Sequence, residues 1–553
     1  MSRTLKWLGI TLVVLLAAAA ALFVHVWYFK PARIDWFYER LFMSFAIHQP
    51  QLLSQLRVVP SWLAWYESDL DDESPAAAER RAVLVRDGLA TLQRYDRAAL
   101  DPEGRLSYDT LEYFLQTSVA GDRYRNHNFP VNQLFGVQSE LPIFMVQVHS
   151  VANARDAEAY VARLDEVPRQ FDGLMESLRL RETQGIVPPR FTVEKVLAQM
   201  KRFVATPPRD SALYVSFREK LDRLPASALD GAGKDRLLAR ADAAITARVY
   251  PAYQRLIEHF TALLPKADGN YGAWHLPDGD SFYAWCVRTH TTTDMTPAEV
   301  HELGLSEVAR LTADIDRILR AQGITEGSVG ERLARVSRDP AQHFPSTAEG
   351  RSALLARYRE ILDEVTGRLD QAFDVKPKFA LEVRPIPEIS QATAPAAYYN
   401  APAFDGSRPG IFFANTRDPA EVAKFEMRTI AYHEGIPGHH LQTAIAQGLP
   451  DVPFFRRILP FTAYHEGWAL YAEQLASEMG LEGDPLDNVG RLREELFRAT
   501  RLVVDTGIHY KRWTREQAIA YMLDRTGMGE ADVTVEIERY FVNPGQALAY
   551  KAA

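Results

Sequence analysis

Three His and one Glu stand within the eight residues 433–440, a local density that the composition does not predict. The chain has 14 His in 553 residues. Five of these lie between positions 433 and 509: His433, His439, His440, His465 and His509. Imidazole and carboxylate groups side by side are ligands for a zinc ion, and a carboxylate can also be the base that activates water. The segment therefore predicts a Zn²⁺ site together with its catalytic base.

The spacing within this segment departs from the usual zinc-peptidase motif, which places two His at i and i+4 on one helical face. Position i+4 from His433 is Pro437. On a regular helix His440 would lie ~10 Å along the axis from His433, and His439 would lie ~9 Å along it and ~120° away. Neither could share an ion with His433, because bonds to zinc are only ~2 Å long.

Pro437 offers an explanation for the unusual spacing. It has no N–H for the carbonyl of His433 and its ring clashes there, so the helix expected over 419–447 must bulge or kink. With Gly438 beside it, the extra residues can leave the helix and bring a later His back above His433. The expected zinc ligands and base are then His433, His439 (with His440 as the alternative) and Glu434.

A second motif supports this site. The segment 461–479 contains Tyr-His-Glu-Gly-Trp and has the apolar spacing of a helix. Its Glu466 follows the first motif at a distance that allows a turn and a second helix, so we expect it to be the third zinc ligand. Glu473 stands seven residues later on nearly the same face, where it can orient a zinc-bound His. The alternative is that Glu466 is an ordinary surface carboxylate.

The two motifs together resemble a known family. The segments 433–442 and 465–473 are similar to motifs of the bacterial domain-of-unknown-function family 885, which is grouped with the gluzincin metallopeptidases. The similarity extends to four further segments: 290–293, 398–410, 504–513 and 544–551. It implies a large, mainly helical fold with a deep cleft, like that of the thermostable carboxypeptidase and angiotensin-converting-enzyme groups. In those groups a His often precedes the Glu ligand, as His465 does here, and the Pro-Gly insertion is where this chain departs from them.

Residues further along the chain are candidates for the substrate side of the site. Arg501, Asp505 and His509 are spaced i, i+4 and i+8, which places them on one stripe of a helix. One interpretation makes His509 a catalytic contact to the substrate or transition state, oriented by Asp505. The other makes the stripe a structural ion-pair ladder.

A tyrosine aimed at the developing oxyanion would complement zinc as electrophile. The segment 536–541 resembles the one with which converting-enzyme relatives place a catalytic Tyr after an Arg; here these residues are Tyr540 and Arg539. Tyr550 is the second candidate. Tyr398 and Tyr399 are candidate substrate contacts, and their alternative is a place in the core or at its rim.

The elements that must position these residues are mainly helices. Apolar residues recur at helical spacing from 34 to about 264, and 296–299 has the capping residues of a helix that ends near 322. Three short strands are expected just before the zinc segment, at 378–384, 396–400 and 410–415. The edge of such a sheet can hold an extended peptide beside the metal.

The fold class is therefore mainly α, with a small β-sheet next to the zinc helix. Three parts are expected: an N-terminal segment (1–30), a helical part (31–290) and a zinc-binding part (291–553), the last two forming one cleft. Residues 7–28 are apolar with three exceptions, and these 22 residues can cross a ~30 Å hydrocarbon core. We expect an uncleaved membrane anchor with the bulk of the chain outside the cytoplasm; the alternative is a cleaved signal peptide and a secreted protein.

Composition limits the class of function. A hydrophobic content of 47% is that of a globular protein, and the net charge of -9 argues against nucleic acid as a partner. The single Cys, Cys286, excludes an internal disulfide, a Cys-rich metal site and a lipid anchor near the N-terminus. We expect a zinc-dependent peptidase of short peptides, of the carboxypeptidase or dipeptidase kind. The alternatives are a zinc amidohydrolase of non-peptide amides and an inactive, membrane-tethered peptide-binding protein; the pattern indicates no oligomeric state.

Overall fold

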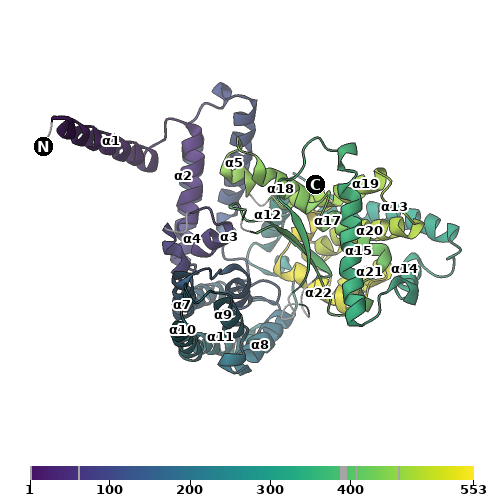
Figure 1. The fold of residues 1–553 in the computed structure, drawn as a ribbon. Coiled ribbons are helices and arrows are strands. Elements are labelled where there is room, and N and C mark those ends of the chain that lie inside the picture. The colour runs from purple at the N-terminus through teal and green to yellow at the C-terminus, as the bar shows by residue number, and fades with distance from the viewer. Residues whose placement is uncertain are drawn as a thin grey trace.

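The computed structural model describes residues 3–59, 63–386, 391, 395–406, 408–458 and 461–552. Positions 1 and 2 of the expected anchor and position 407 of the segment 398–410 lie outside the described residues. The described chain is mainly helical and contains one three-stranded sheet (Figure 1). The predicted secondary-structure class is therefore confirmed.

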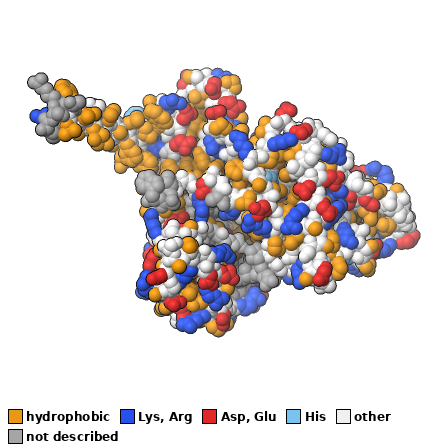
Figure 2. All heavy atoms as spheres, viewed as in Figure 1, with side chains coloured by type: hydrophobic (Ala, Val, Ile, Leu, Met, Phe, Trp, Pro, Cys, Tyr) orange, Lys and Arg blue, Asp and Glu red, His pale blue; other side chains and the backbone are white. Residues whose placement is uncertain are grey.

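The first helix, α1 (Arg3–Tyr28), stands apart from the rest of the chain (Figure 1). Its span Leu5–Tyr28 is long and apolar enough to cross a membrane, and none of its most apolar window is buried inside the protein. Figure 2 shows the helix covered by hydrophobic side chains. Arg40 of the next helix donates from Nη1 to the carbonyls of Val26 (3.1 Å) and Phe29 (2.6 Å), so the end of α1 is capped by the body of the protein.

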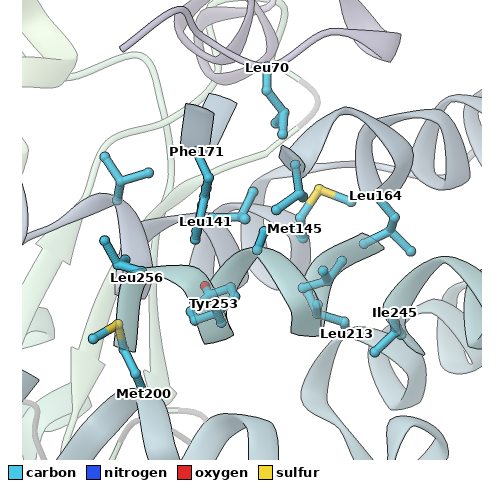
Figure 3. Close-up of a cluster of buried hydrophobic side chains, with 14 of the residues drawn as sticks. Leu70, Leu141, Met145, Leu164, Phe171, Met200, Leu213, Ile245, Tyr253 and Leu256 are labelled. Atoms are coloured by element: carbon cyan, nitrogen blue, oxygen red, sulfur yellow. The ribbon is translucent and has the colours of Figure 1, made fainter. Parts of the chain in front are cut away.

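In the N-terminal half, the helices between residues 137 and 263 bury their apolar faces in one large core, and the other helices of this half pack in smaller clusters. Figure 3 shows Leu141, Met145, Phe171 and Tyr253 converging in the large core, and the hydroxyl of Tyr253 donates to the carbonyl of Gln138 (2.6 Å). A buried phenol needs such a partner. The helices of this half are α2 (Ile34–Ala46), α3 (Pro50–Leu56), α4 (Pro75–Leu92), α5 (Pro102–Gly121), α6 (Val137–Ile143), α7 (Ala154–Thr183), α8 (Arg190–Ala205), α9 (Ala212–Asp222), α10 (Gly231–Ala244), α11 (Tyr250–Leu263) and α12 (Gly279–Thr291).

The second half is organised around α20 (Pro485–His509), in which nearly every residue from Val489 onward is buried. Helix α13 (Pro297–Ala321) packs along it and begins with the predicted capping box, in which the Thr296 and Glu299 side chains bond each other's backbone N–H. The remaining helices of this half are α14 (Val329–Ser337), α15 (Ala348–Thr366), α17 (Met427–Glu434), α18 (His439–Gly448), α19 (Thr462–Glu478), α21 (Arg515–Thr526) and α22 (Glu530–Val542).

The sheet lies beside α15 (Figure 1) and shares a core with α15 and α17. Its strands are β1 (Leu381–Pro385), β2 (Ala397–Asn400) and β3 (Gly410–Ala414), close to the three predicted segments. The order is β1-β3-β2, with β1 parallel and β2 antiparallel to β3. Phe412 of β3 packs on Tyr358 of α15, with ring centroids 4.8 Å apart, in a core that continues onto α17. The sheet thereby supports the helix that carries His433.

The single helix expected over 419–447 is not formed as such. Two 3₁₀ turns occupy Pro419–Glu421 and Lys424–Glu426, α17 begins only at Met427, and it ends at Glu434. Helix α18 starts at His439, so four residues separate the two helices. The predicted start near residue 419 was wrong, and the predicted disruption next to Pro437 is present.

Candidate metal centre

The segment between α17 and α18 returns the chain over the end of α17. It contains a cis peptide bond between Ile436 and Pro437. A Cβ on Gly438 would lie 2.0 Å from the carbonyl oxygen of His433 and 2.3 Å from that of Tyr432, so only glycine permits this approach. The close approach carries the next residue, His439, back beside His433. Their ring centroids are 4.9 Å apart with an interplanar angle of 84°.

Neighbouring elements hold this reversal in place. The indole N–H of Trp468 on α19 donates to the carbonyl of Pro437 (3.0 Å), and the amide of Gln442 on α18 donates to the carbonyl of Tyr464 on α19 (2.9 Å). The hydroxyl of Tyr432 donates to the carbonyl of Leu481 (3.0 Å). Both sequence motifs are thus joined by hydrogen bonds between α19 and the segment around the reversal.

Three side chains converge where the reversal meets α19. The carboxylate Oε2 of Glu466 lies 3.6 Å from Nε2 of His433 and 3.5 Å from Nε2 of His439. All three potential ligand atoms lie within 4.8 Å of one another. Ligands bound to zinc at ~2.0–2.2 Å with tetrahedral angles lie about 3.4 Å apart. The two measured separations match that value, so the donor set fits a zinc ion.

The charges at this point favour a cation. Burial lowers the pKa of the His433 imidazole, but hydrogen bonding to Glu466 and Glu473 outweighs it and raises the pKa to about 10. Burial likewise opposes ionisation of Glu466, yet His433 and His439 hold the pKa of its carboxyl well below its usual range. The cluster therefore stabilises negative charge on Glu466 and positive charge beside it, which a bound cation would also supply.

Glu473, predicted to orient a zinc-bound His, forms a hydrogen bond with His433. The Nδ1–H of His433 donates to Oε1 of Glu473 at 2.7 Å, and both side chains are buried. This bond holds the ring through Nδ1 and turns Nε2 toward Glu466, where it can bind a metal that displaces its proton. The other carboxylate oxygen of Glu473 has no hydrogen-bond partner in the described part of the chain.

Glu434 and His440 both lie against strand β2 but make different contacts. The backbone N–H of Tyr399 donates to Oε2 of Glu434 (3.0 Å). Nε2 of His440 donates to the carbonyl of Phe379 (3.2 Å), and Nδ1 accepts from the hydroxyl of Tyr399 (3.1 Å). Burial lowers the pKa of His440 to about 4, so its ring is neutral. His440 is thus bound to the sheet, and the cluster contains His439.

Comparison with other proteins identifies the family of this chain. Residues 54–553 match the family model described as "Bacterial protein of unknown function (DUF885)". The chain belongs to the DUF885 family. None of the curated proteins matches it.

Two solved structures are similar to this DUF885 chain, and each is described as a "putative lipoprotein". The one from Colwellia psychrerythraea is 32% identical and has a TM-score of 0.90, with 94% of this chain and 90% of that chain covered. The one from Shewanella oneidensis, described as of unknown function, is 18% identical with a TM-score of 0.68, covering 94% of this chain and 91% of that one. The second similarity concerns the fold alone.

In this DUF885 structure, the described hydrogen bonds of Tyr540 and His509 are with residues outside the cluster. The Tyr540 hydroxyl donates to Oε1 of Glu536 (2.7 Å) within α22, and burial raises its pKa well above the usual range. His509 is fully buried, and Nδ1 accepts from the N–H of Ala273 (2.8 Å) while Nε2 donates to the carbonyl of Tyr540 (3.0 Å). Both ring nitrogens of His509 therefore serve the backbone.

Asp505 does not orient His509. Its carboxylate accepts from the hydroxyl of Tyr283 (2.6 Å) and from the N–H of Gly545 (3.2 Å). Burial raises the pKa of Asp505 to about 7. The expected catalytic pair is absent, because α20 turns this stripe toward the protein core and the C-terminal segment.

Tyr550 is the tyrosine that lies beside the cluster. Its ring stacks on His433, with centroids 6.3 Å apart and an interplanar angle of 17°. Two guanidinium groups lie over the same ring, that of Arg501 at 4.4 Å and that of Arg498 at 5.6 Å. Sequence reasoning ranked Tyr550 second and missed Arg498, although its position three residues before Arg501 on one helix was a usable signal.

The contacts described for the remaining predicted residues are with other parts of the protein. Tyr398 packs on Phe413, with ring centroids 5.0 Å apart, and the ring of His465 lies 5.8 Å from that of Tyr464. Arg539 donates to Oε1 of Gln546 (2.5 Å). None of these described contacts reaches the three converging side chains.

Proposed function

We propose that this DUF885 protein is a gluzincin-type, zinc-dependent metallopeptidase that hydrolyses short peptides. The observation that carries the proposal is the convergence of His433, His439 and Glu466, with His433 oriented by Glu473. Among the described residues no fourth His, Cys, Asp or Glu joins this group. Structural zinc sites have four protein ligands, whereas catalytic sites have three and keep one position open. The three-residue set therefore supports catalysis.

Each residue has a defined part in the proposed reaction. A zinc ion, when bound, would polarise the scissile carbonyl and lower the pKa of water at the site. Glu434 accepts a proton from the attacking water and delivers it to the leaving amine. The N–H of Tyr399 supports this role, because it holds the Glu434 carboxylate at 3.0 Å. Tyr550, rather than Tyr540, is the phenol placed to stabilise the developing oxyanion.

Strand β2 supports a peptide as the substrate. It is an edge strand of the described sheet, and the N–H of Tyr399 points away from β3 and toward Glu434. An extended chain can pair with such an edge through its backbone and so lie beside the base. A deep cleft between the two helical parts would restrict the enzyme to short or extended peptides.

The N-terminal helix supports a location at the membrane. We propose that α1 anchors the protein and that the bulk of the chain lies outside the cytoplasm. The Colwellia psychrerythraea protein is described as a "putative lipoprotein", and α1 would replace a lipid here, since the one Cys, Cys286, is buried in α12. Deleting residues 1–24, which leaves the carbonyls bonded by Arg40 in place, is expected to move the protein from the membrane fraction to the soluble fraction. Recovery of full-length protein in the soluble fraction would contradict the anchor.

Metal analysis combined with a Glu434→Gln variant tests the function. The purified protein is expected to bind one zinc ion, to cleave members of a short-peptide library and to lose this activity with a chelator. Glu434→Gln is expected to retain zinc and lose at least about 100-fold in kcat. Glu478→Gln, an exposed carboxylate on α19, is the matched control.

Two results would contradict the proposal. Unchanged hydrolysis by the zinc-loaded Glu434→Gln variant would remove Glu434 as the base. A library of muropeptides and other amides is assayed beside the peptides. Cleavage confined to non-peptide amides would contradict the peptidase and indicate an amidohydrolase.

A further inference from the structure

A group of arginines lies near the ring of Tyr550, which stacks on His433, one of the proposed zinc ligands. The ring of Tyr550 contacts both the guanidinium of Arg501, which lies 4.4 Å from its centroid, and the imidazole of His433, whose centroid is 6.3 Å away. Phe497 covers Arg501 as well, at 4.3 Å. Two aromatic faces thus hold this guanidinium in a fixed orientation next to the candidate centre.

The hydrogen-bonding capacity of these arginines is only partly used. Arg501 is 4% exposed, and its Nη2 pairs with Oε1 of Glu536 at 2.6 Å. Its Nε and Nη1 have no partner in the part of the chain that the structure describes, and the same holds for Nε of Arg498 and of Arg539. A buried donor left without an acceptor is destabilising. A ligand with several acceptor oxygens would remove that destabilisation.

Charge also favours an anion at this place. Arg498 pairs with Glu494, Arg501 pairs with Glu536, and Arg539 approaches the same Glu536 only to 3.9 Å. Three guanidinium groups therefore share two carboxylates. A ligand with one negative charge and two oxygens would balance the charge and match the fork of a guanidinium.

We propose that Arg501, assisted by Arg498 and Arg539, binds the terminal carboxylate of the peptide substrate. The proposal rests on the proposed function and makes the protein an exopeptidase that requires a free C-terminus. An extended chain advances about 3.3 Å per residue. Because Arg501 and His433 contact the same tyrosine ring, the short distance between them then limits the released fragment to one or two residues.

Binding to an inactive protein tests this site without depending on hydrolysis. Zinc-loaded Glu434→Gln protein is titrated with pairs of acetylated tri- and tetrapeptides that differ only in a C-terminal acid or amide. The acid is expected to bind at least about 30-fold more tightly, because it restores charge-assisted bonds to the buried donors. Equal affinity for acid and amide, within threefold, would overturn the carboxylate site.

Variants identify the residue. Arg501→Lys keeps the charge and loses the fork, so it is expected to weaken binding of the acid about 10-fold and leave the amide unchanged. Arg209→Lys, at an exposed arginine paired with Asp242, is the matched control. If Arg501→Lys does not fold by circular dichroism, Arg498→Gln takes its place with the same expectation. If neither variant loses the preference for the acid over the amide, the assignment of Arg501 is contradicted.

Hydrolysis by the wild-type enzyme separates failure of this site from failure of the proposed function. Zinc-dependent cleavage of acids and amides at equal kcat/KM would overturn the carboxylate site and leave the peptidase intact. Acid-selective binding without cleavage of any peptide would support the site and contradict the peptidase. Cleavage of acids at least about 100-fold faster than amides, one or two residues from the C-terminus, would support both.

Discussion

Replacing Glu473 by Gln is expected to weaken zinc binding without changing any residue proposed to touch the ion. Oε1 of Glu473 accepts the Nδ1–H of His433 at 2.7 Å, and the other oxygen has no partner among the described residues. The charge of this buried carboxylate is therefore directed mainly at one imidazole. Gln keeps the acceptor oxygen and the shape of the side chain but removes the charge.

The contact sets the size of the effect. A buried hydrogen bond to a charged group contributes about 1.5–3 kcal/mol, and Gln keeps the neutral part of it. Changes in residues that hold a metal-binding His weaken the metal by about 10–100-fold, which is about 1.4–2.7 kcal/mol. We expect Glu473→Gln near the lower limit and Glu473→Ala, which also removes the acceptor, near the upper limit.

Competition with a chromogenic chelator of known zinc affinity at pH 7.5 measures this effect. Circular dichroism and thermal melting of each protein establish that it is folded. Glu478→Gln on the same helix is the matched control, because Glu478 is exposed and bonds only to the Gln474 amide among its described contacts. Its zinc affinity is expected to equal that of the wild type.

Zinc affinity within threefold of the wild type in both folded Glu473 variants would contradict this role of the Glu473–His433 contact. His433 would then not bind the ion through Nε2 in the orientation that Glu473 holds. A graded loss from Gln to Ala, with the control unchanged, is the only pattern that the contact allows.

Three further changes have expected outcomes. Gly438→Ala puts a Cβ 2.0 Å from a carbonyl oxygen of α17 and is expected to lower zinc affinity more than about 10-fold. Gly448→Ala, at the far end of α18, is expected to leave zinc affinity unchanged. The same competition assay measures both affinities. Tyr550→Phe is expected to lower kcat about 100-fold or more, while Tyr540→Phe leaves kcat within threefold and reduces the unfolding free energy by about 1 kcal/mol; equal kcat values would contradict this. The pKa of Asp505 is raised by burial to about 7, so the folded state keeps a proton that the unfolded state has already lost above pH ~4. Stability of the wild type relative to Asp505→Asn is therefore expected to fall by about 4 kcal/mol between pH 4 and 7 and then stay level, as urea unfolding would show.

The secondary structure could be predicted because the signals are local. The apolar spacing of α19 and the capping box of α13 each require only neighbouring residues. The extent of α17 could not be predicted in this way. Apolar residues from 419 onward have helical spacing, but two 3₁₀ turns precede Met427, where packing against α20 and the sheet determines the backbone.

Most of the candidate metal centre was accessible from the sequence for the same reason. Steric exclusion at Pro437 is a local effect, and the close approach of Gly438 to α17 brings back His439 as expected. Neighbouring residues in the sequence could not decide between His439 and His440. It depends on Phe379 and Tyr399, which come from the sheet some forty to sixty residues earlier and bind both nitrogens of His440.

The choice between Tyr540 and Tyr550 shows what the sequence could not supply. Both tyrosines follow α20, and each is next to a cationic residue in sequence, so local pattern favours neither. The structure separates them through α20, which places Arg501 between Glu536 and the ring of Tyr550. Tyr540 is then hydrogen-bonded to the carboxylate that pairs with this arginine, and Tyr550 contacts both the arginine and His433. The buried arginine thus accounts for the tyrosine ring that lies against His433, and its own remaining donors provide the basis for the proposed carboxylate site next to that ring.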